Sequence, residues 1–182
     1  MKQVIFVFHL FIVSCGFYSL AGSIPPHIKS ISIPLVENQT SEFSLSEELT
    51  DAINSQFNQS GILLIQNEGE AHSTLKGTIN KITDGPYSYN KNESISEYRY
   101  KVDVKIEWYD NTEEKNIIDK NYSGFGAYGL SGDISADGID NDNDGKIDSE
   151  DDNEFGEPRS FAAKVAINKI AEDILNDIMT TW

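Results

Sequence analysis

Twelve consecutive residues, 140–151, have the residue types and the spacing of a calcium-binding loop. Oxygen-bearing side chains occupy positions 1, 3, 5, 9 and 12 of this loop, and Gly145 occupies position 6. Calcium prefers about six to eight oxygen ligands, and a glycine at the sixth position permits the sharp turn that directs alternate side chains toward one point. The predicted ligands are Asp140, Asp142, Asp144, the main-chain carbonyl of Lys146, Asp148 and Asp151. The sequence therefore predicts that this loop binds one calcium ion.

The loop lacks the flanking features of a helix-loop-helix calcium site. Asp151 stands where the twelfth position usually carries glutamate, and residues 132–138 upstream are unsuited to an entering helix. We therefore expect a calcium loop without helices, similar to the aspartate-rich loops of dockerins. The alternative interpretation is an acidic, solvated linker.

The negative charge of the chain is concentrated around this loop. The formal net charge is −16 over 182 residues, and residues 127–158 contain eleven acidic residues and one lysine. This segment accounts for −10 of the total, so we interpret it as an acidic insert in a mildly acidic domain. Such a distribution argues against nucleic acid as a partner.

The N-terminus has the pattern of a lipoprotein signal peptide. Lys2 precedes an apolar run at residues 4–13, which is too short to span a bilayer. The run is followed by Ser14 and Cys15, an arrangement that resembles the site at which bacterial lipoproteins are lipidated and cleaved. Residues 1–14 are therefore predicted to be removed, and Cys15, the only cysteine, to carry the acyl chains of a membrane anchor. The alternative is an ordinary secreted protein with a leftover thiol.

Apolar periodicity predicts the elements that hold these segments in place. Strands are expected at residues 28–36, at 62–65 continued by 75–79, at 98–108 and at 115–125, with a stop at Asp84-Gly85-Pro86. Helices are expected at residues 45–58, introduced by a capping box from Ser44 to Glu47, and over about twenty residues up to the C-terminus. These elements predict an α+β fold with two helices packed on one face of a mostly antiparallel four-stranded sheet.

The predicted strand at residues 98–108 alternates between apolar and polar residues, so one face packs and the other meets water. The polar face carries Arg99, Lys101 and Lys105, which are candidates for contact with a polar partner surface or with lipid phosphates. A solvated sheet face is the alternative interpretation for each of them.

The residue types needed for catalysis are scarce. Beyond the predicted signal peptide the histidines are His27 and His72, neither lies near a nucleophile motif, and the sequence has no glycine-rich phosphate loop. We therefore do not expect an enzyme.

Four segments carry a further signal: Cys15-Gly16-Phe17-Tyr18-Ser19-Leu20, residues 28–40, Glu48-Leu49-Thr50-Asp51-Ala52-Ile53 and Leu75-Lys76-Gly77-Thr78-Ile79. In this order they resemble the LptE family of lipopolysaccharide-assembly lipoproteins. The resemblance divides the chain into a signal peptide at 1–14, an LptE-like domain at 15–126 and 159–182, and the acidic insert at 127–158.

The resemblance implies a lipid-anchored protein on the periplasmic side of the outer membrane. Such a protein complexes with the β-barrel LptD, sits partly inside it, and assists the assembly and transport of lipopolysaccharide. Gly16 agrees with this location, because aspartate after the lipidated cysteine retains enteric lipoproteins at the inner membrane.

Two other functions remain open at this point. One is an envelope lipoprotein that activates a peptidoglycan synthase, because a similar opening strand occurs in that broader group. The other is a calcium-binding surface lipoprotein, although such proteins usually contain arrays of loops and this chain has one.

Overall fold

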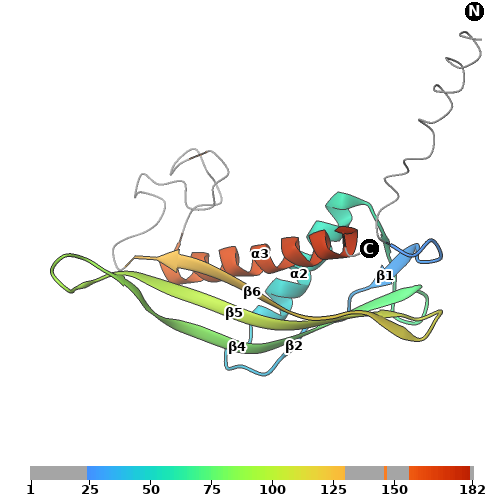
Figure 1. Cartoon of the computed structure of the whole chain (residues 1–182), viewed down its shortest axis with the longest axis horizontal. Coiled ribbons are helices and arrows are strands. Elements are labelled where there is room, and N and C mark those ends of the chain that lie inside the picture. Colours follow the sequence, from blue (N-terminus) through green and yellow to red (C-terminus); the bar gives the residue numbers. More distant parts are fainter. Residues whose placement is uncertain (1–23, 130–145, 147–155, 181–182) are drawn as a thin grey trace, which may run out of the picture.

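A six-stranded mixed sheet and two helices make up the part of the chain that the structure describes (Figure 1). The structure is a computed structural model that describes residues 24–129, 146 and 156–180. The elements in chain order are β1 (Ser30–Ser32), β2 (Glu37–Asn38), α2 (Leu45–Ser60), β3 (Leu64–Ile65), β4 (Ser73–Tyr89), β5 (Ile95–Asp110), β6 (Lys115–Tyr128) and α3 (Pro158–Thr180). The α+β class is as predicted.

The sheet is mostly antiparallel, as predicted, but it differs from the prediction in strand number. Its order is β3-β1-β4-β5-β6, and β2 pairs with β4 on the same side as β1, further along the strand. Strands β4, β5 and β6 form the expected antiparallel meander, but β1 lies parallel to β3 and to β4, and β2 lies parallel to β4. The prediction of four strands was wrong because two of the predicted strands are each divided: the first forms β1 and β2 on either side of Pro34, and the second forms the separate strands β3 and β4. Proline lacks the N–H that a continuous ladder requires.

Strand β4 also continues through the predicted stop at Gly85 and Pro86. Pro86 pairs with Tyr98 of β5, and register shifts flank Ser88. The neighbours of β4 on its other side, β1 and β2, end their pairing at Ile79. Beyond that residue β4 is an edge strand, and an edge strand tolerates a proline whose missing N–H faces the open side.

The core lies between the sheet and both helices. Tyr100, Val102, Val104, Ile106 and Trp108 of β5 are buried, as the alternation predicts, and the residues between them are half-exposed. The apolar face of α3 enters the same core and contains Phe161, Ala162, Ala163, Ala166, Ile167, Ile170, Ala171, Ile174, Leu175 and Ile178. Helix α2 adds Leu45, Leu49, Ile53 and Phe57 to this core. Both helices therefore cover one face of the sheet and leave the other face open.

The predicted capping box at the start of α2 does not form. Ser44 already has helical backbone angles and makes no side-chain capping hydrogen bond. A capping residue normally has backbone angles outside the helical range, which lets its side chain accept from the free N–H groups of the first turn. The end of α2 follows the usual pattern, because Gly61 adopts φ 62° and its N–H donates to the carbonyl of Phe57.

Helix α3 packs against β6 at unusually short range because glycines remove side chains from the contact. A Cβ atom on Gly124 would lie 2.1 Å from the carbonyl oxygen of Ala166, and one on Gly126 would lie 2.2 Å from that of Ala162. Further along, Lys120 and Tyr122 both donate hydrogen bonds to Asp177 of α3. Burial alone would raise the pKa of Asp177, but these two donors outweigh it and hold that pKa below its ordinary value.

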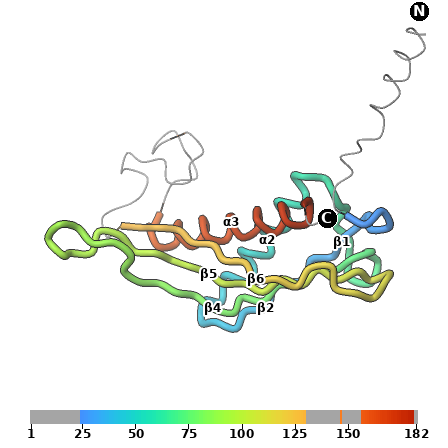
Figure 2. The backbone as a smooth tube through the Cα atoms, in the orientation of Figure 1, coloured from blue at the N-terminus to red at the C-terminus, as the bar shows by residue number. Residues whose placement is uncertain are grey.

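The β4–β5 hairpin extends past the start of α3, as both backbone views show (Figures 1 and 2). Its turn begins at Asn90, whose N–H donates to the carbonyl of Ser94. Every residue from 83 to 97 is exposed or half-exposed. This end of the hairpin therefore presents both of its faces to partners or solvent. No helix in the described ranges is both long and apolar enough to cross a membrane.

Candidate binding face of the sheet

The open face of the sheet carries the three basic residues predicted from the sequence, but two of them are paired with neighbours. Lys101 Nζ lies 2.7 Å from a carboxylate oxygen of Asp103. Lys105 Nζ lies 2.8 Å from Glu107 and 3.3 Å from Asp119 on β6. These exposed ion pairs neutralise the two lysines locally, and because solvent and salt screen them they contribute little to stability.

Arg99 has a different environment, because its guanidinium lies between two aromatic rings. The guanidinium carbon is 3.2 Å from the ring centre of Tyr87 on β4 and 4.0 Å from that of Phe125 on β6. The direct cross-strand neighbours of Arg99 are Gly85 and Ala127, which are too small to fill this space. The rings can therefore close over the guanidinium from both sides. Sequence alternation identified Arg99 as a candidate, but not its aromatic partners.

The Tyr87–Arg99–Phe125 stack has the chemistry of a protein-binding surface. Tyr87 and Phe125 are 53% and 50% exposed, although both are large and apolar. Arginine and tyrosine are enriched among the residues that dominate interface energies. Stacking also holds the planar fork of a guanidinium in one orientation, which favours bidentate binding of a carboxylate or phosphate. Arg99 Nε is buried and has no hydrogen-bond partner among the described residues.

A second arginine fixes the hairpin to the helical layer beneath this stack. Arg159, in the first turn of α3, donates to Asp84 at 2.6 Å and to Glu42 at 2.7 Å. Tyr128 also donates to Asp84, at 2.6 Å, and burial together with this hydrogen bond raises the pKa of Tyr128 to about 12. The partners in these hydrogen bonds are 44 to 117 positions apart in sequence, so no local pattern predicted the cluster. It determines where the hairpin stands relative to α3.

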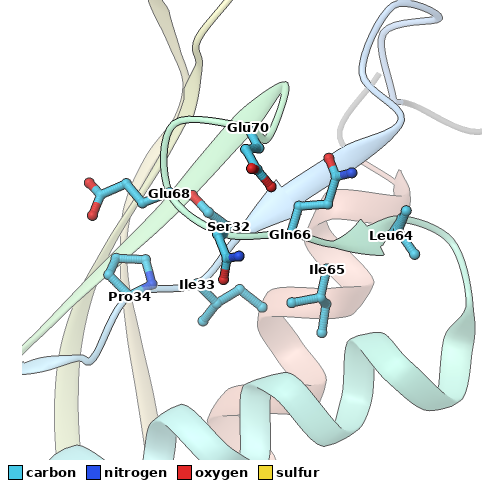
Figure 3. Close-up of a pocket in the computed structure, with 9 residues that line it drawn as sticks. Ser32, Ile33, Pro34, Leu64, Ile65, Gln66, Glu68 and Glu70 are labelled. Atoms are coloured by element: carbon cyan, nitrogen blue, oxygen red, sulfur yellow. The ribbon is translucent and has the colours of Figure 1, made fainter.

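A groove at the opposite edge of the sheet is a weaker candidate. It has a volume of about 560 Å³ and lies between β1, β3 and the loop after β3. In Figure 3, Ile33 and Ile65 point toward α2, whereas Glu68 and Glu70 project from the loop that borders the groove. The nine lining residues include these two acidic residues and no basic one, so the groove is unsuited to a phosphate group.

The structure brings one histidine close to a serine that the sequence did not connect with it. His72 Nδ1 lies 2.9 Å from Ser30 Oγ, and Ser30 Oγ also accepts a hydrogen bond from the backbone N–H of His72. Ser30 is only 2% exposed, and its backbone carbonyl accepts from Ser73. Because a catalytic serine must be reached by substrate, this pair is best understood as a link between β1 and β4.

The remaining predicted sites lie outside the described residues. These are Cys15 and the predicted calcium ligands Asp140, Asp142, Asp144, Asp148 and Asp151. Lys146 is described, and it is exposed and belongs to neither a helix nor a strand.

Comparisons with solved structures show the fold alone, because sequence identities are low. Protein XCC0632 from Xanthomonas campestris aligns with a TM-score of 0.55 at 6% identity, over 87% of this chain and 90% of that one. The hypothetical protein CT253 from Chlamydia trachomatis aligns with a TM-score of 0.51 at 11% identity, over 83% and 98%. Rare lipoprotein B from Shewanella oneidensis has a TM-score of 0.46, which is too low to support an argument.

Sequence comparison shows the family. No curated protein matches this chain significantly. The sequence model of the LptE family, described as lipopolysaccharide-assembly, matches residues 28–182 and so includes both helices and the whole sheet. The chain therefore belongs to the LptE family.

Proposed function

We propose that this protein is an outer-membrane lipoprotein that assists the assembly and transport of lipopolysaccharide by forming a complex with an LptD-like β-barrel. The family match over residues 28–182 is the observation that carries this proposal. The role is one of binding and assembly, not of chemistry.

The open face of the sheet supports a contact with the barrel. Side chains inside an outer-membrane barrel are largely polar, so a protein that enters its lumen needs a polar surface with a few strong anchor points. The face described above has this composition: ion pairs around Lys101 and Lys105, and the Tyr87–Arg99–Phe125 stack near the hairpin end. Arg99 is also the group on this face best suited to bind a lipid phosphate.

Reversing the charge of Arg99 should weaken the complex with the barrel. The detergent-solubilised full-length protein is expected to retain the barrel in affinity purification, and Arg99→Glu should raise the dissociation constant about thirty-fold, the effect of losing roughly 2 kcal/mol at an interface hot spot. Lys164→Glu makes the same charge change on the exposed side of α3 and serves as the control.

Two different results would contradict the proposed binding face and the proposed function. Equal barrel binding by wild type and Arg99→Glu would contradict the assignment of this face. Normal barrel maturation and normal surface lipopolysaccharide in a deletion strain would contradict the proposed function, and would favour activation of a peptidoglycan synthase or a calcium-binding surface role.

We further propose that residues 140–151 bind one calcium ion and thereby order the acidic insert. The mutual repulsion of several carboxylates opposes a closed loop, and a divalent ion cancels part of this repulsion while it fixes the backbone. The dissociation constant should be on the order of 10⁻⁴ to 10⁻³ M, as in extracellular modules.

Calorimetry and limited proteolysis test this expectation. The wild-type protein should bind one calcium ion and gain protection only within the insert, whereas Asp144→Ala should lose both effects. Asp133→Ala, which removes a carboxylate of the insert outside the predicted loop, is the control. Unchanged cleavage at millimolar calcium would reject the calcium assignment and leave an acidic linker.

A further inference from the structure

We propose that His27, Asp110 and Glu113 form a binding site for a transition-metal dication, with zinc the best match. His27 lies three residues before β1, Asp110 is the last residue of β5, and Glu113 lies in the turn between β5 and β6. One donor atom from each of the three side chains lies within 4.8 Å of the other two. The site is remote in sequence from the acidic insert and does not depend on the proposed complex with a barrel.

The imidazole of His27 lies between two carboxylates. Its Nε2 is 2.6 Å from Asp110 Oδ2, and its Nδ1 is 3.9 Å from Glu113 Oε1. His27 is one-third exposed and Glu113 is about half-exposed, so an ion can reach the cluster from solvent. Because an imidazole binds one ion through one nitrogen, Nε2 beside Asp110 would be the ligand, and the exposed Glu113 would rotate from the Nδ1 side to join it.

Asp110 is held in position for this role. Its side chain is 0% exposed, and its Oδ1 accepts hydrogen bonds from the backbone N–H groups of Thr112 at 2.9 Å and of Glu113 at 3.1 Å. The second oxygen, Oδ2, is therefore aimed at His27. Metal-binding carboxylates are commonly oriented by such hydrogen bonds from outside the ligand set.

The combination of one imidazole and two carboxylates determines the class of metal. Zinc binds nitrogen and oxygen at about 2.0 to 2.2 Å, which places tetrahedral ligand atoms about 3.4 Å apart, and a water completes the fourth position. His27 and Asp110 would have to separate by less than about 1 Å to reach this spacing. Calcium is disfavoured because it requires more oxygen ligands than these three side chains offer, and it does not favour imidazole.

Nearby charge permits a cation at this position. Lys115 donates to Glu113 Oε2, which leaves Oε1 for the ion, and the positive charge of Lys115 is smaller than the combined charge of the two carboxylates. The bound ion would join the segment before β1 to the β5–β6 turn. Because an ion that binds only the folded state stabilises it, zinc should raise the unfolding temperature.

Zinc titration of the full-length protein, purified without a polyhistidine tag, tests the site. In calcium-containing buffer we expect one zinc ion to bind and to raise the unfolding temperature by several degrees. His27→Gln and Glu113→Gln should each weaken zinc binding at least ten-fold. His72→Gln, which changes the other histidine of the described domain, should bind zinc as the wild type does. Cobalt(II) should give the visible absorption of a low-coordinate site in the wild type and in His72→Gln, but not in His27→Gln or Glu113→Gln.

The controls locate any binding that occurs. Asp144→Ala should bind zinc normally, because its substitution affects only the predicted calcium loop. The proposal is overturned if the wild type binds no zinc at micromolar concentration, if folded Glu113→Gln and His27→Gln bind it unchanged, or if Asp144→Ala abolishes binding. The unfolding temperature of each variant without zinc shows whether it is folded. Glu113→Gln should stay folded, because the side chain of Glu113 is exposed.

Discussion

Gly124→Ala is expected to lower the free energy of unfolding by about 3 kcal/mol, the upper end of the usual cost of overpacking a core. The added Cβ would lie 2.1 Å from the carbonyl oxygen of Ala166 and 2.9 Å from a side-chain carbon of Ile170. The first of these neighbours is backbone inside α3, so no side chain can rotate away to relieve the contact. The helix would have to move off β6, and the core contacts of its apolar face would loosen.

Gly85→Ala is the matched control for this experiment. Gly85 lies in β4, has no positive φ, and a Cβ at this position would meet no atom within 4 Å. Its unfolding free energy should therefore stay within about 0.5 kcal/mol of the wild-type value. Urea denaturation followed by the fluorescence of buried Trp108 measures both variants. Wild-type stability of Gly124→Ala would show that α3 does not pack on β6 as described.

Cys15→Ala is expected to abolish membrane attachment almost completely. In our proposal the thiol of Cys15 carries the acyl chains, and each buried CH₂ group contributes about 0.8 kcal/mol to anchoring. The lipidated protein is therefore held stably at the membrane, whereas the unlipidated variant has no anchor. The variant should accumulate as an unprocessed precursor or as a soluble periplasmic protein.

Membrane fractionation and mass spectrometry of the mature N-terminus measure this effect. Ser14→Ala, which changes the adjacent residue and keeps the thiol, should remain lipidated and membrane-bound. A wild-type mature N-terminus at another residue, or an unmodified Cys15 in the membrane fraction, would reject the lipid anchor.

The sequence by itself determined the elements whose burial follows a regular period. The alternation from Tyr98 to Trp108 predicted a strand with one buried face, and the spacing of apolar residues after Phe161 predicted the amphipathic helix α3. Both predictions were confirmed because each pattern lies within one element, and the position of its apolar residues indicates which face of that element is buried. The ordered short motifs identified the LptE family for a related reason, since each is contained in a few adjacent residues.

Only the tertiary structure decided how these elements combine. The parallel pairing of β1, β2 and β3 and the passage of β4 through Pro86 depend on which strand lies beside each position, and no local pattern contains that information. The same reason explains the sites. The ring partners of Arg99 come from the two neighbouring strands, and His27 meets Asp110 across 83 residues of sequence. Sequence patterns report what each residue does within its own segment, whereas a binding site is made by side chains from several segments whose meeting depends on the packed core.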